Sequence, residues 1–506
     1  WQTISPDLTR ESWDIPASVG IYTNEDMKKM PRRGVIYTIA PSPKDINTIW
    51  CGTDDGLIHV TKDGGKNWKI VTPPSVTSWS KVSLMDASHF DVNTVYAAVN
   101  RIRLDDMNPH IYKTTDGGKS WKEIVNGLPD DPINAVREDP LRKGLLFAGS
   151  EKAVYVSFDD GEHWQSLRLN MPATSIRDLV IKDDDIVVGT HGRSFWILDD
   201  ITPLRQLTNQ LINQSTILYK PQSTYRVRWS MYTDTPLPQE EPSGENPPDG
   251  AIINYFLKEK SNSEVVMEIF NSNKKLVRRF SSNDTTYKIP EVNIPLYWIR
   301  PQQILSGEAG SHRFVWDLRY EPLNIPASYP ISAVYKNTAP NPTSPFVLPG
   351  TYIIKFTVDK KSYIQPLTIK MDPRVKTSIA DLKKQHDLSL IAYESRKQTM
   401  KILDELGTIR KQLKEKLSNA NPTSEARIKE ADQQAAGLEI TPPNSQDQSF
   451  TKLNNAFASI FDILQDTDMP PTMQTITATK ETQESFKKLI NIWQVLKNKI
   501  NVLLSE

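Results

Sequence analysis

Several residue types and patterns are scarce in this 506-residue chain, and each scarcity excludes a class of protein. The single cysteine, Cys51, excludes an intrachain disulfide framework and any cysteine-rich metal site. Because Cys51 lies in an apolar run, we expect a buried, unreactive thiol. The seven histidines are scattered without metal-ligand spacing, and no phosphate-binding glycine-rich loop or Gly-x-Ser-x-Gly motif is present. The sequence therefore predicts no metal site, no cofactor and no nucleotide chemistry.

The chain also lacks a net charge and long apolar runs. Its 61 Lys and Arg residues balance 61 Asp and Glu residues, so no net field attracts nucleic acid or an anionic membrane. No stretch approaches the roughly 18 apolar residues of a transmembrane helix, so we expect no transmembrane segment. The sequence begins at Trp1 and shows no signal peptide, which predicts a processed form or a fragment.

What the first 200 residues do contain is a repeat. The pattern Ser/Thr-x-Asp-x-Gly-x-x-Trp occurs three times at a spacing of about 40–55 residues. In such a turn, Asp and Ser/Thr side chains bond backbone N–H groups, Gly adopts a positive φ, and Trp packs onto the sheet below. We therefore expect a structural role for the nine defining residues. They are Asp63, Gly65, Trp68, Asp116, Gly118, Trp121, Asp159, Gly161 and Trp164.

Four short predicted strands surround each of these turns, with the turn between the third and fourth strand. That arrangement is typical of propeller blades. A fourth set of strands covers 178–198 and lacks both the turn and a fourth strand, which we attribute to ring closure. Residues 1–5 resemble the last strand of a preceding blade. About four blades are too few for the usual larger rings, so half a propeller is expected to be missing.

The three repeats resemble the Asp-boxes, or bacterial-neuraminidase repeats, of sialidases, sortilin-type propellers and xyloglucanase-type hydrolases. The segments 52–59 and 189–200 in particular are similar to secreted bacterial proteins described as glycosyl hydrolases or sortilin-like repeat proteins. The resemblance implies a bacterial protein that is secreted, periplasmic or on the outer cell surface. It also implies that the N-terminal propeller half comes from the same full-length protein. Neither a sialidase arginine triad nor the cysteine-rich modules of sortilin receptors can be assigned.

The predicted fold class is mainly β: a partial Asp-box propeller, an immunoglobulin-like β-sandwich and a C-terminal helical bundle. Period-two patterns from residue 251 predict the sandwich, and a change to the helical period near Ser378 predicts the bundle. The expected boundaries are 1–204 for the propeller, 205–250 for a Pro-rich linker, 251–374 for the sandwich and 375–506 for the bundle.

Candidate functional residues follow from the two unlike faces of a propeller. The loops between second and third strands, and those between blades, lie opposite the Asp-box turns and can carry a binding site. The carboxylates proposed there as weak catalytic candidates are Asp54, Asp55, Asp105 and Glu151. The candidate ligand-binding residues are Trp79, Arg101, Arg103, Arg177, His191 and Arg193. The alternative interpretation of all these side chains is ion pairing and turn capping in exposed loops.

Two functions remain open from the sequence. The favoured one is a binding and assembly module whose partner is another envelope protein or a glycan. The alternative is a glycoside hydrolase, which needs two carboxyl groups at about 5 Å or 6.5–9.5 Å, one with a raised pKa. Asp183-Asp184-Asp185 suggests Ca²⁺ only weakly, since a hydrophilic turn explains it as well.

Overall fold

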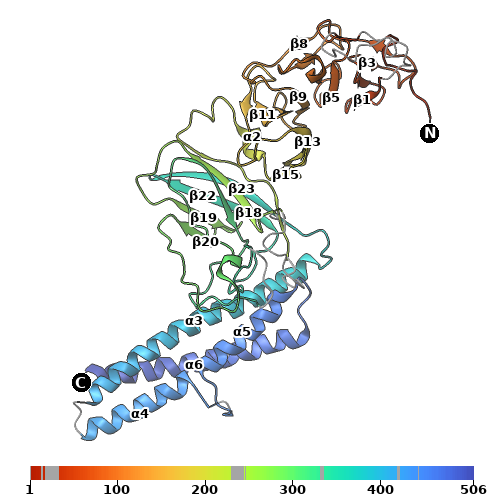
Figure 1. Cartoon of the computed structure of the whole chain (residues 1–506). Helices are drawn as coiled ribbons and strands as arrows, with labels where there is room; N and C mark the ends of the chain where they lie inside the picture. The colour runs from red at the N-terminus through yellow and green to blue at the C-terminus, as the bar shows by residue number, and fades with distance from the viewer. Residues whose placement is uncertain are drawn as a thin grey trace. The chain divides into compact units, whose positions relative to one another are not determined.

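The computed structural model describes residues 2–12, 15–16, 34–228, 244, 247–330, 336–418, 422–442 and 444–505. The chain divides into two compact units, Trp1–Asn213 and Gln214–Glu506 (Figure 1). Unit 1 is built from small β-sheets, and unit 2 combines two larger sheets with the C-terminal helices. Each unit is described below by itself.

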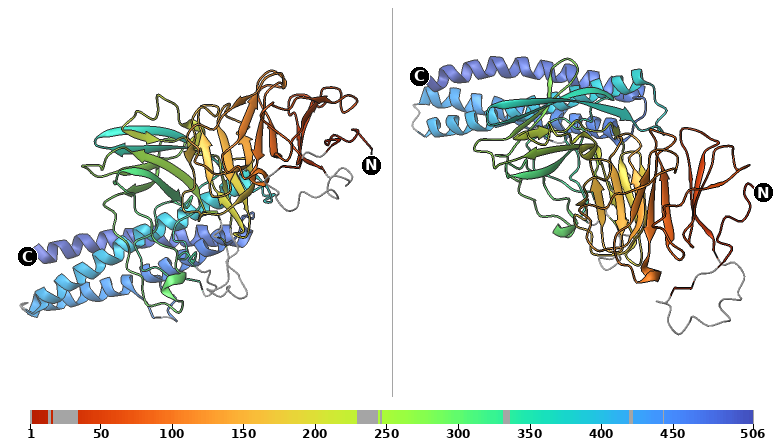
Figure 2. Two further views of the ribbon diagram at one scale, coloured as in Figure 1. Left: turned by 45° about the horizontal axis from the view of Figure 1, so that its top comes forward. Right: turned by 90° about the horizontal axis from the view of Figure 1, so that it is seen from above.

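The described part of unit 1 contains four consecutive small antiparallel sheets, in which each strand pairs with the next one along the chain (Figure 2). The first sheet is β1 (Ile36–Pro41), β2 (Ile49–Thr53), β3 (Ile58–Thr61) and β4 (Lys69–Ile70). The second is β5 (Lys81–Ala87), β6 (Val95–Asn100), β7 (Ile111–Thr114) and β8 (Lys122–Glu123). The third is β9 (Ile133–Glu138), β10 (Leu146–Ser150), β11 (Val154–Ser157) and β12 (Gln165–Ser166). The fourth is β13 (Ile176–Lys182), β14 (Asp185–Thr190) and β15 (Phe195–Leu198). This up-and-down order is that of propeller blades.

A hydrophobic core lies between each pair of adjacent sheets in unit 1. Trp50 belongs to the core between the first and second sheets, together with Met85. Tyr96 and Leu146 share the core of the second and third sheets. The third core joins the third and fourth sheets. Middle sheets are therefore buried on both faces, which explains why their strands are apolar at consecutive positions. Cys51 is buried, and burial raises the pKa of its thiol to about 12.

The predicted strand at residues 1–5 is not a strand in the structure. Residues 2–5 have no sheet partner among the described strands, and Trp1 lies outside the described residues. The fourth sheet ends at β15 and is followed by the short helix α2 (Thr202–Gln206). In the described part of unit 1, no fourth strand pairs with β15.

Unit 2 begins with a two-sheet sandwich around one hydrophobic core. The three-stranded sheet has the order β16 (Thr216–Leu218), β18 (Ala251–Leu257) and β21 (Gly310–Trp316). The five-stranded sheet has the order β17 (Thr224–Arg226), β23 (Lys361–Met371), β22 (Gly350–Val358), β19 (Val266–Phe270) and β20 (Leu276–Ser281). β18 begins at Ala251, where the sequence pattern predicts the start of the sandwich. The immunoglobulin-like description of this sandwich stays a prediction.

The sandwich includes two strands from the segment predicted as a linker. β16 pairs antiparallel with β18, and β17 pairs parallel with β23. The prediction of a linker over 205–250 therefore needs correction, because part of this segment belongs to the sheets. Three-residue strands are too short to display a period-two pattern, and the neighbouring prolines conceal them.

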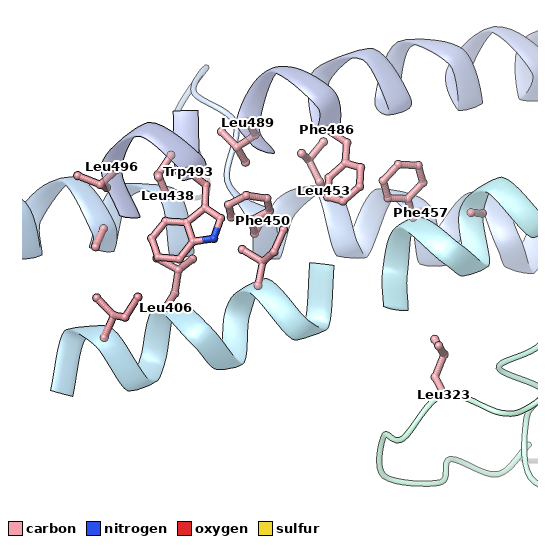
Figure 3. Close-up of a cluster of buried hydrophobic side chains, with 14 of the residues drawn as sticks. Leu323, Leu406, Leu438, Phe450, Leu453, Phe457, Phe486, Leu489, Trp493 and Leu496 are labelled. Atoms are coloured by element: carbon pink, nitrogen blue, oxygen red, sulfur yellow. The ribbon is translucent and has the colours of Figure 1, made fainter. Parts of the chain in front are cut away.

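The structure describes four helices in the C-terminal region, where the change of period predicts helices: α3 (Ile379–Leu417), α4 (Pro422–Glu439), α5 (Phe450–Asp466) and α6 (Met473–Ser505). Ser378 caps α3, since its hydroxyl accepts a hydrogen bond from the Asp381 N–H. Figure 3 shows Phe450, Phe486 and Trp493 pointing into the shared core of these helices. Among the described helices, none is both long enough and apolar enough to cross a membrane.

A buried ion pair joins the sandwich to the helices. Arg226 Nη2 lies 2.6 Å from Asp468 Oδ1, and the two side chains are only 3% and 5% exposed. Arg319 stacks on the Phe346 ring, with its guanidinium carbon 3.6 Å from the ring centroid. Burial lowers the pKa of the Arg319 guanidinium to about 9, a value that still leaves it charged at neutral pH.

Candidate functional site

The three Asp-box turns share one hydrogen-bond pattern. In the first, the Thr61 hydroxyl donates to Asp63 Oδ1 at 2.8 Å, and the Gly65 N–H donates to Thr61 Oγ1 at 3.0 Å. Asp63 Oδ1 also accepts from the Asn67 N–H at 2.9 Å. The bonds from the backbone and side chain of Asn67, followed by the bond from Thr61, lower the pKa of Asp63 to about 2. The turns around Asp116 and Asp159 repeat this arrangement.

Each Asp-box tryptophan also joins its sheet to the preceding segment. The indole Nε1–H groups of Trp68, Trp121 and Trp164 donate to one backbone carbonyl each. The accepting residues are Ile4 at 3.0 Å, Val71 at 2.7 Å and Ile124 at 2.8 Å, respectively. Val71 and Ile124 directly follow the last strands of the first and second sheets. Ile4 thus occupies the place that the end of a preceding blade would take.

The Asp-box glycines make the same contact from the other side of the turn. A Cβ on Gly118 would lie 2.7 Å from Val71 Cβ, and a Cβ on Gly161 would lie 2.4 Å from Ile124 Cδ1. Both glycines have positive φ, at 83° and 90°. The Asp-box face is therefore a set of links between successive sheets, which we call the latch.

The loops opposite the Asp-box turns form what we call the rim. The predicted carboxylates of the rim are bound to other parts of unit 1. Asp54 Oδ2 lies 3.3 Å from Arg103 Nη1, which links the first and second sheets. Asp54 Oδ1 also accepts from the Val35 N–H at 2.8 Å. Asp55 Oδ2 accepts from the Arg10 N–H at 2.8 Å, and Arg10 Nε donates to the Asp55 carbonyl. Sequence analysis missed Arg10, because nothing in its surroundings marks it as a partner of this rim.

The second sheet contributes a separate cluster to this rim. Arg101 pairs with Asp106 at 3.1 Å, and His110 lies between Asp106 and Glu123 with contacts of 3.0 and 2.7 Å. Burial acts to raise the pKa of Asp106, but hydrogen bonds from Asn108 and His110 outweigh it, and the pKa is lowered. The neighbouring candidate Asp105 is exposed and ends a short 3-10 helix with φ 56°.

The third and fourth sheets are joined on the rim by Glu151. Glu151 Oε1 accepts from Asn134 Nδ2 at 2.9 Å and lies 3.3 Å from Arg177 Nη1. Asn134 in turn accepts from Asn100 of the second sheet at 2.8 Å. Burial would raise the pKa of Glu151, but the bonds from Ser175 and Asn134 and the charge of Arg177 lower it overall.

The remaining candidates lie apart from these clusters. His191 and Arg193 are exposed in the loop between β14 and β15, where the His191 N–H donates to the Ser175 carbonyl. The Arg193 N–H donates to Thr190 Oγ1 at 3.1 Å. Trp79 is half-buried and has a positive φ of 68°. The structure thus brings together Asp54 with Arg103 and Glu151 with Arg177, and it leaves Asp105, Trp79, His191 and Arg193 outside both pairs.

One pair on this rim has the opposite pKa shifts that acid–base chemistry requires. Burial raises the pKa of Asp131, whereas the pKa of Glu151 is lowered. However, Asp131 is only 1% exposed and accepts a hydrogen bond from the Ser150 hydroxyl. A carboxyl group that no substrate can reach cannot protonate a leaving group. Asp131 and Glu151 therefore do not form an accessible acid–base pair.

The Asp183-Asp184-Asp185 turn is engaged in contacts within the protein. Asp184 pairs with Arg205, Asp183 pairs with Lys182, and Asp185 accepts from the Asp200 N–H. Within the ranges that the structure describes, no group of three or more His, Cys, Asp or Glu side chains could hold a metal ion.

Comparisons with known proteins give structural neighbours only. No family model matches the chain, and no curated protein matches it. YCF48 from Cyanidioschyzon merolae aligns at 21% identity over 33% of this chain and 54% of that chain, with a TM-score of 0.27. YCF48 bound to D1 peptide aligns at 16% identity over 49% and 72%, with a TM-score of 0.27. The computationally designed Ika4 protein aligns at 19% identity over 33% and 93%, with a TM-score of 0.24. The chain thus spans about half the length of the first of these proteins. The description of the small sheets as blades rests on their own strand order.

Proposed function

We propose that this chain is part of a secreted or cell-envelope Asp-box propeller protein of the sortilin-like type, and that it works as a protein-binding assembly module. The observation that carries the proposal is the burial of the first strand in each sheet. β5 and β9, in the middle sheets, are mostly buried along their length. β1 and β13, in the end sheets, expose much of theirs.

Several exposed positions of β1 and β15 are apolar, whereas β13 exposes Arg177, Asp178 and Lys182 as well as Val180. On β1, Tyr37 is 51% exposed and Ile39 is 64% exposed. On the fourth sheet, Phe195 is 77% exposed and Ile197 is 59% exposed, while the alternate residues of β15 pack on the core. Apolar residues on both faces of a strand are typical of a strand covered on both sides. We call the exposed parts of β1 and of β13–β15 the end faces.

The Ile4 segment supports the same proposal. The Trp68 indole binds the Ile4 carbonyl as Trp121 binds the carbonyl that follows β4. Residues 2–5 would therefore be the last strand of a preceding blade, and the rest of that blade would cover the β1 end face. We propose that this blade belongs to the N-terminal half of the same full-length protein. Another envelope protein is the partner proposed for the β15 end face.

Binding of a glycan at the rim, with or without hydrolysis, is less well supported. The rim carboxylates Asp54 and Glu151 pair with arginine side chains, and the Asp55 carboxylate accepts from the Arg10 backbone N–H; these contacts join neighbouring parts of unit 1. A substrate would have to break such a contact before it could reach either carboxylate.

The proposal is tested by affinity isolation from the native envelope, with mass spectrometry of the retained proteins. We expect a stoichiometric partner with the wild-type chain and its loss with the Phe195→Asp/Ile197→Asp variant. Lys66→Glu is the control, because Lys66 is exposed on the first Asp-box turn, away from the end faces. A polysaccharide hydrolysis panel runs in parallel. Turnover that disappears in Glu151→Gln while Phe195→Asp/Ile197→Asp retains it would overturn the proposal in favour of a glycoside hydrolase.

A further inference from the structure

The outer edge of β15 carries backbone groups that the other three sheets of unit 1 pair with a fourth strand. In an antiparallel ladder, alternate residues bond to the strand on one side only, so the Phe195 and Ile197 backbone groups face away from β14. On that side no described strand pairs with β15, and no other described backbone bond reaches either carbonyl. An open strand edge of this kind readily accepts another strand.

The three complete sheets show which strand such an edge accepts. In the first sheet, the Val71 N–H donates to the Ile58 carbonyl at 2.9 Å. Ile58 has the same register position in its sheet as Phe195 has in the fourth. The corresponding bonds run from Ile124 to Ile111 at 2.9 Å and from Leu167 to Val154 at 2.8 Å. In every case the donor is an aliphatic residue three positions after the Asp-box tryptophan.

A second unfilled position lies at the Leu167 carbonyl. Leu167 directly follows the fourth strand of the third sheet, as Val71 and Ile124 follow those of the first and second. The carbonyls of Val71 and Ile124 each accept an indole N–H from the next Asp-box tryptophan. Among the described residues, no backbone N–H reaches the Leu167 carbonyl, and no Asp-box follows it in the chain. Leu167 is accordingly half-buried, whereas Val71 and Ile124 are 5% and 2% exposed.

We infer that a partner protein fills both positions with one extended segment, Trp-x-x-aliphatic, which pairs antiparallel with β15 as its fourth strand. The aliphatic residue donates its N–H to the Phe195 carbonyl, and the residue after the tryptophan exchanges backbone bonds with Ile197. The indole N–H donates to the Leu167 carbonyl. One segment can make all these contacts, because Trp121 and Ile124 make their equivalents in the second repeat.

The inference rests on the proposed binding of a partner at the β15 end face and gives that partner a recognition chemistry. Residues 1–4 of the chain also have the Trp-x-x-aliphatic spacing. However, Ile4 is bound to Trp68 beside the first sheet, and residues 2–4 do not pair with β15. The segment that completes the fourth sheet is therefore expected from another protein.

The probe is a fluorescein-labelled peptide with the sequence of residues 120–125, Ser-Trp-Lys-Glu-Ile-Val. Its anisotropy is measured against the complete chain, and we expect saturable binding. N-methylation of the peptide's isoleucine removes the N–H that bonds to Phe195 and should weaken binding at least about tenfold. N-methylation of its glutamate is the matched control, since the Glu123 N–H faces away from β7 in the second sheet, and it should leave the affinity unchanged.

A pair of protein variants tests the same edge from the other side. Ile197→Pro removes the N–H that faces the peptide and should weaken binding at least about tenfold. Ile197→Thr keeps this N–H and should bind the peptide within about threefold of the wild type. Hydrogen exchange of β14 verifies that both variants keep the fourth sheet folded. In the wild type, the Ile197 amide should exchange rapidly and gain protection when the peptide is added.

The inference is overturned if the peptide does not bind at about 1 mM, or if both N-methylated peptides bind alike. It is also overturned if the Ile197 amide is already protected in the free monomeric chain, because the edge would then be occupied from within. A dimer that is lost when residues 1–5 are deleted would assign the edge to a second copy instead. Envelope-partner capture that survives Ile197→Pro but not Phe195→Asp/Ile197→Asp refutes strand pairing and retains the proposed function. Peptide binding without any captured partner refutes only the proposed function.

Discussion

The latch between successive sheets gives a prediction whose size follows from burial. Replacing Trp164 with Phe removes the Nε1–H that donates to the Ile124 carbonyl at 2.8 Å, in a contact that is fully buried. A buried acceptor without its donor costs about 1–3 kcal/mol. The smaller ring also leaves a void, and we expect a total loss of roughly 2–4 kcal/mol. The same change at Trp68, whose bond to Ile4 is exposed, should cost only about 0.5–1 kcal/mol.

The assay has to separate unit 1 from unit 2, because one optical transition would mix them. Hydrogen exchange with mass spectrometry meets this need, since protection of the β8 and β12 peptides reports on the sheets that the Trp164 latch joins. A loss of 1.4 kcal/mol appears as about tenfold faster exchange from the globally unfolded state. Equal effects at Trp68 and Trp164, or an effect below about 0.5 kcal/mol at Trp164, would refute the latch as the link between sheets.

Three further predictions test other parts of the structure. Asp468→Ala leaves Arg226 and Arg228 without their shared carboxylate and should destabilise unit 2 by about 3–5 kcal/mol, measured by hydrogen exchange of the β17 peptide. The double change Arg226→Met/Asp468→Leu should cost less, because it removes the more deeply buried of the two arginines as well. The folded-state pKa of Asp63 is about 2, below its usual 3.8, so its contribution to stability is complete above pH 3.8 and is lost as the pH falls toward about 2. In urea unfolding at a series of pH values, Asp63→Asn should lack this part of the acid dependence. Gly161→Ala combines a positive φ of 90° with a Cβ 2.4 Å from Ile124 Cδ1, and exchange of the β12 peptide should show a loss of about 1–3 kcal/mol.

Much of the architecture is predictable because it depends on local patterns. The Asp-box residues specify a turn over eight positions, and the change from period two to the helical period near Ser378 marks the start of α3. The nearly continuous apolar run at 251–257 coincides with β18. By contrast, β16 and β17 are recognisable only through strands far along the chain, since β17 pairs with the distant β23.

The rim contacts were not predictable as pairs, because they depend on which loops meet in space. Asp54 and Arg103 are far apart in sequence, and only the packing of adjacent sheets brings them to 3.3 Å. Arg10 carries no local signal at all.

The most direct test of the assembly proposal is hydrogen exchange of the chain alone and in complex with its isolated envelope partner. The account predicts new protection in the peptides that contain β15, where Phe195 and Ile197 are exposed. Peptides from α3 and α6 should be unchanged. Protection confined to the helices, or to the rim around Asp54 and Glu151 with the β15 end face still exchanging freely, would contradict it.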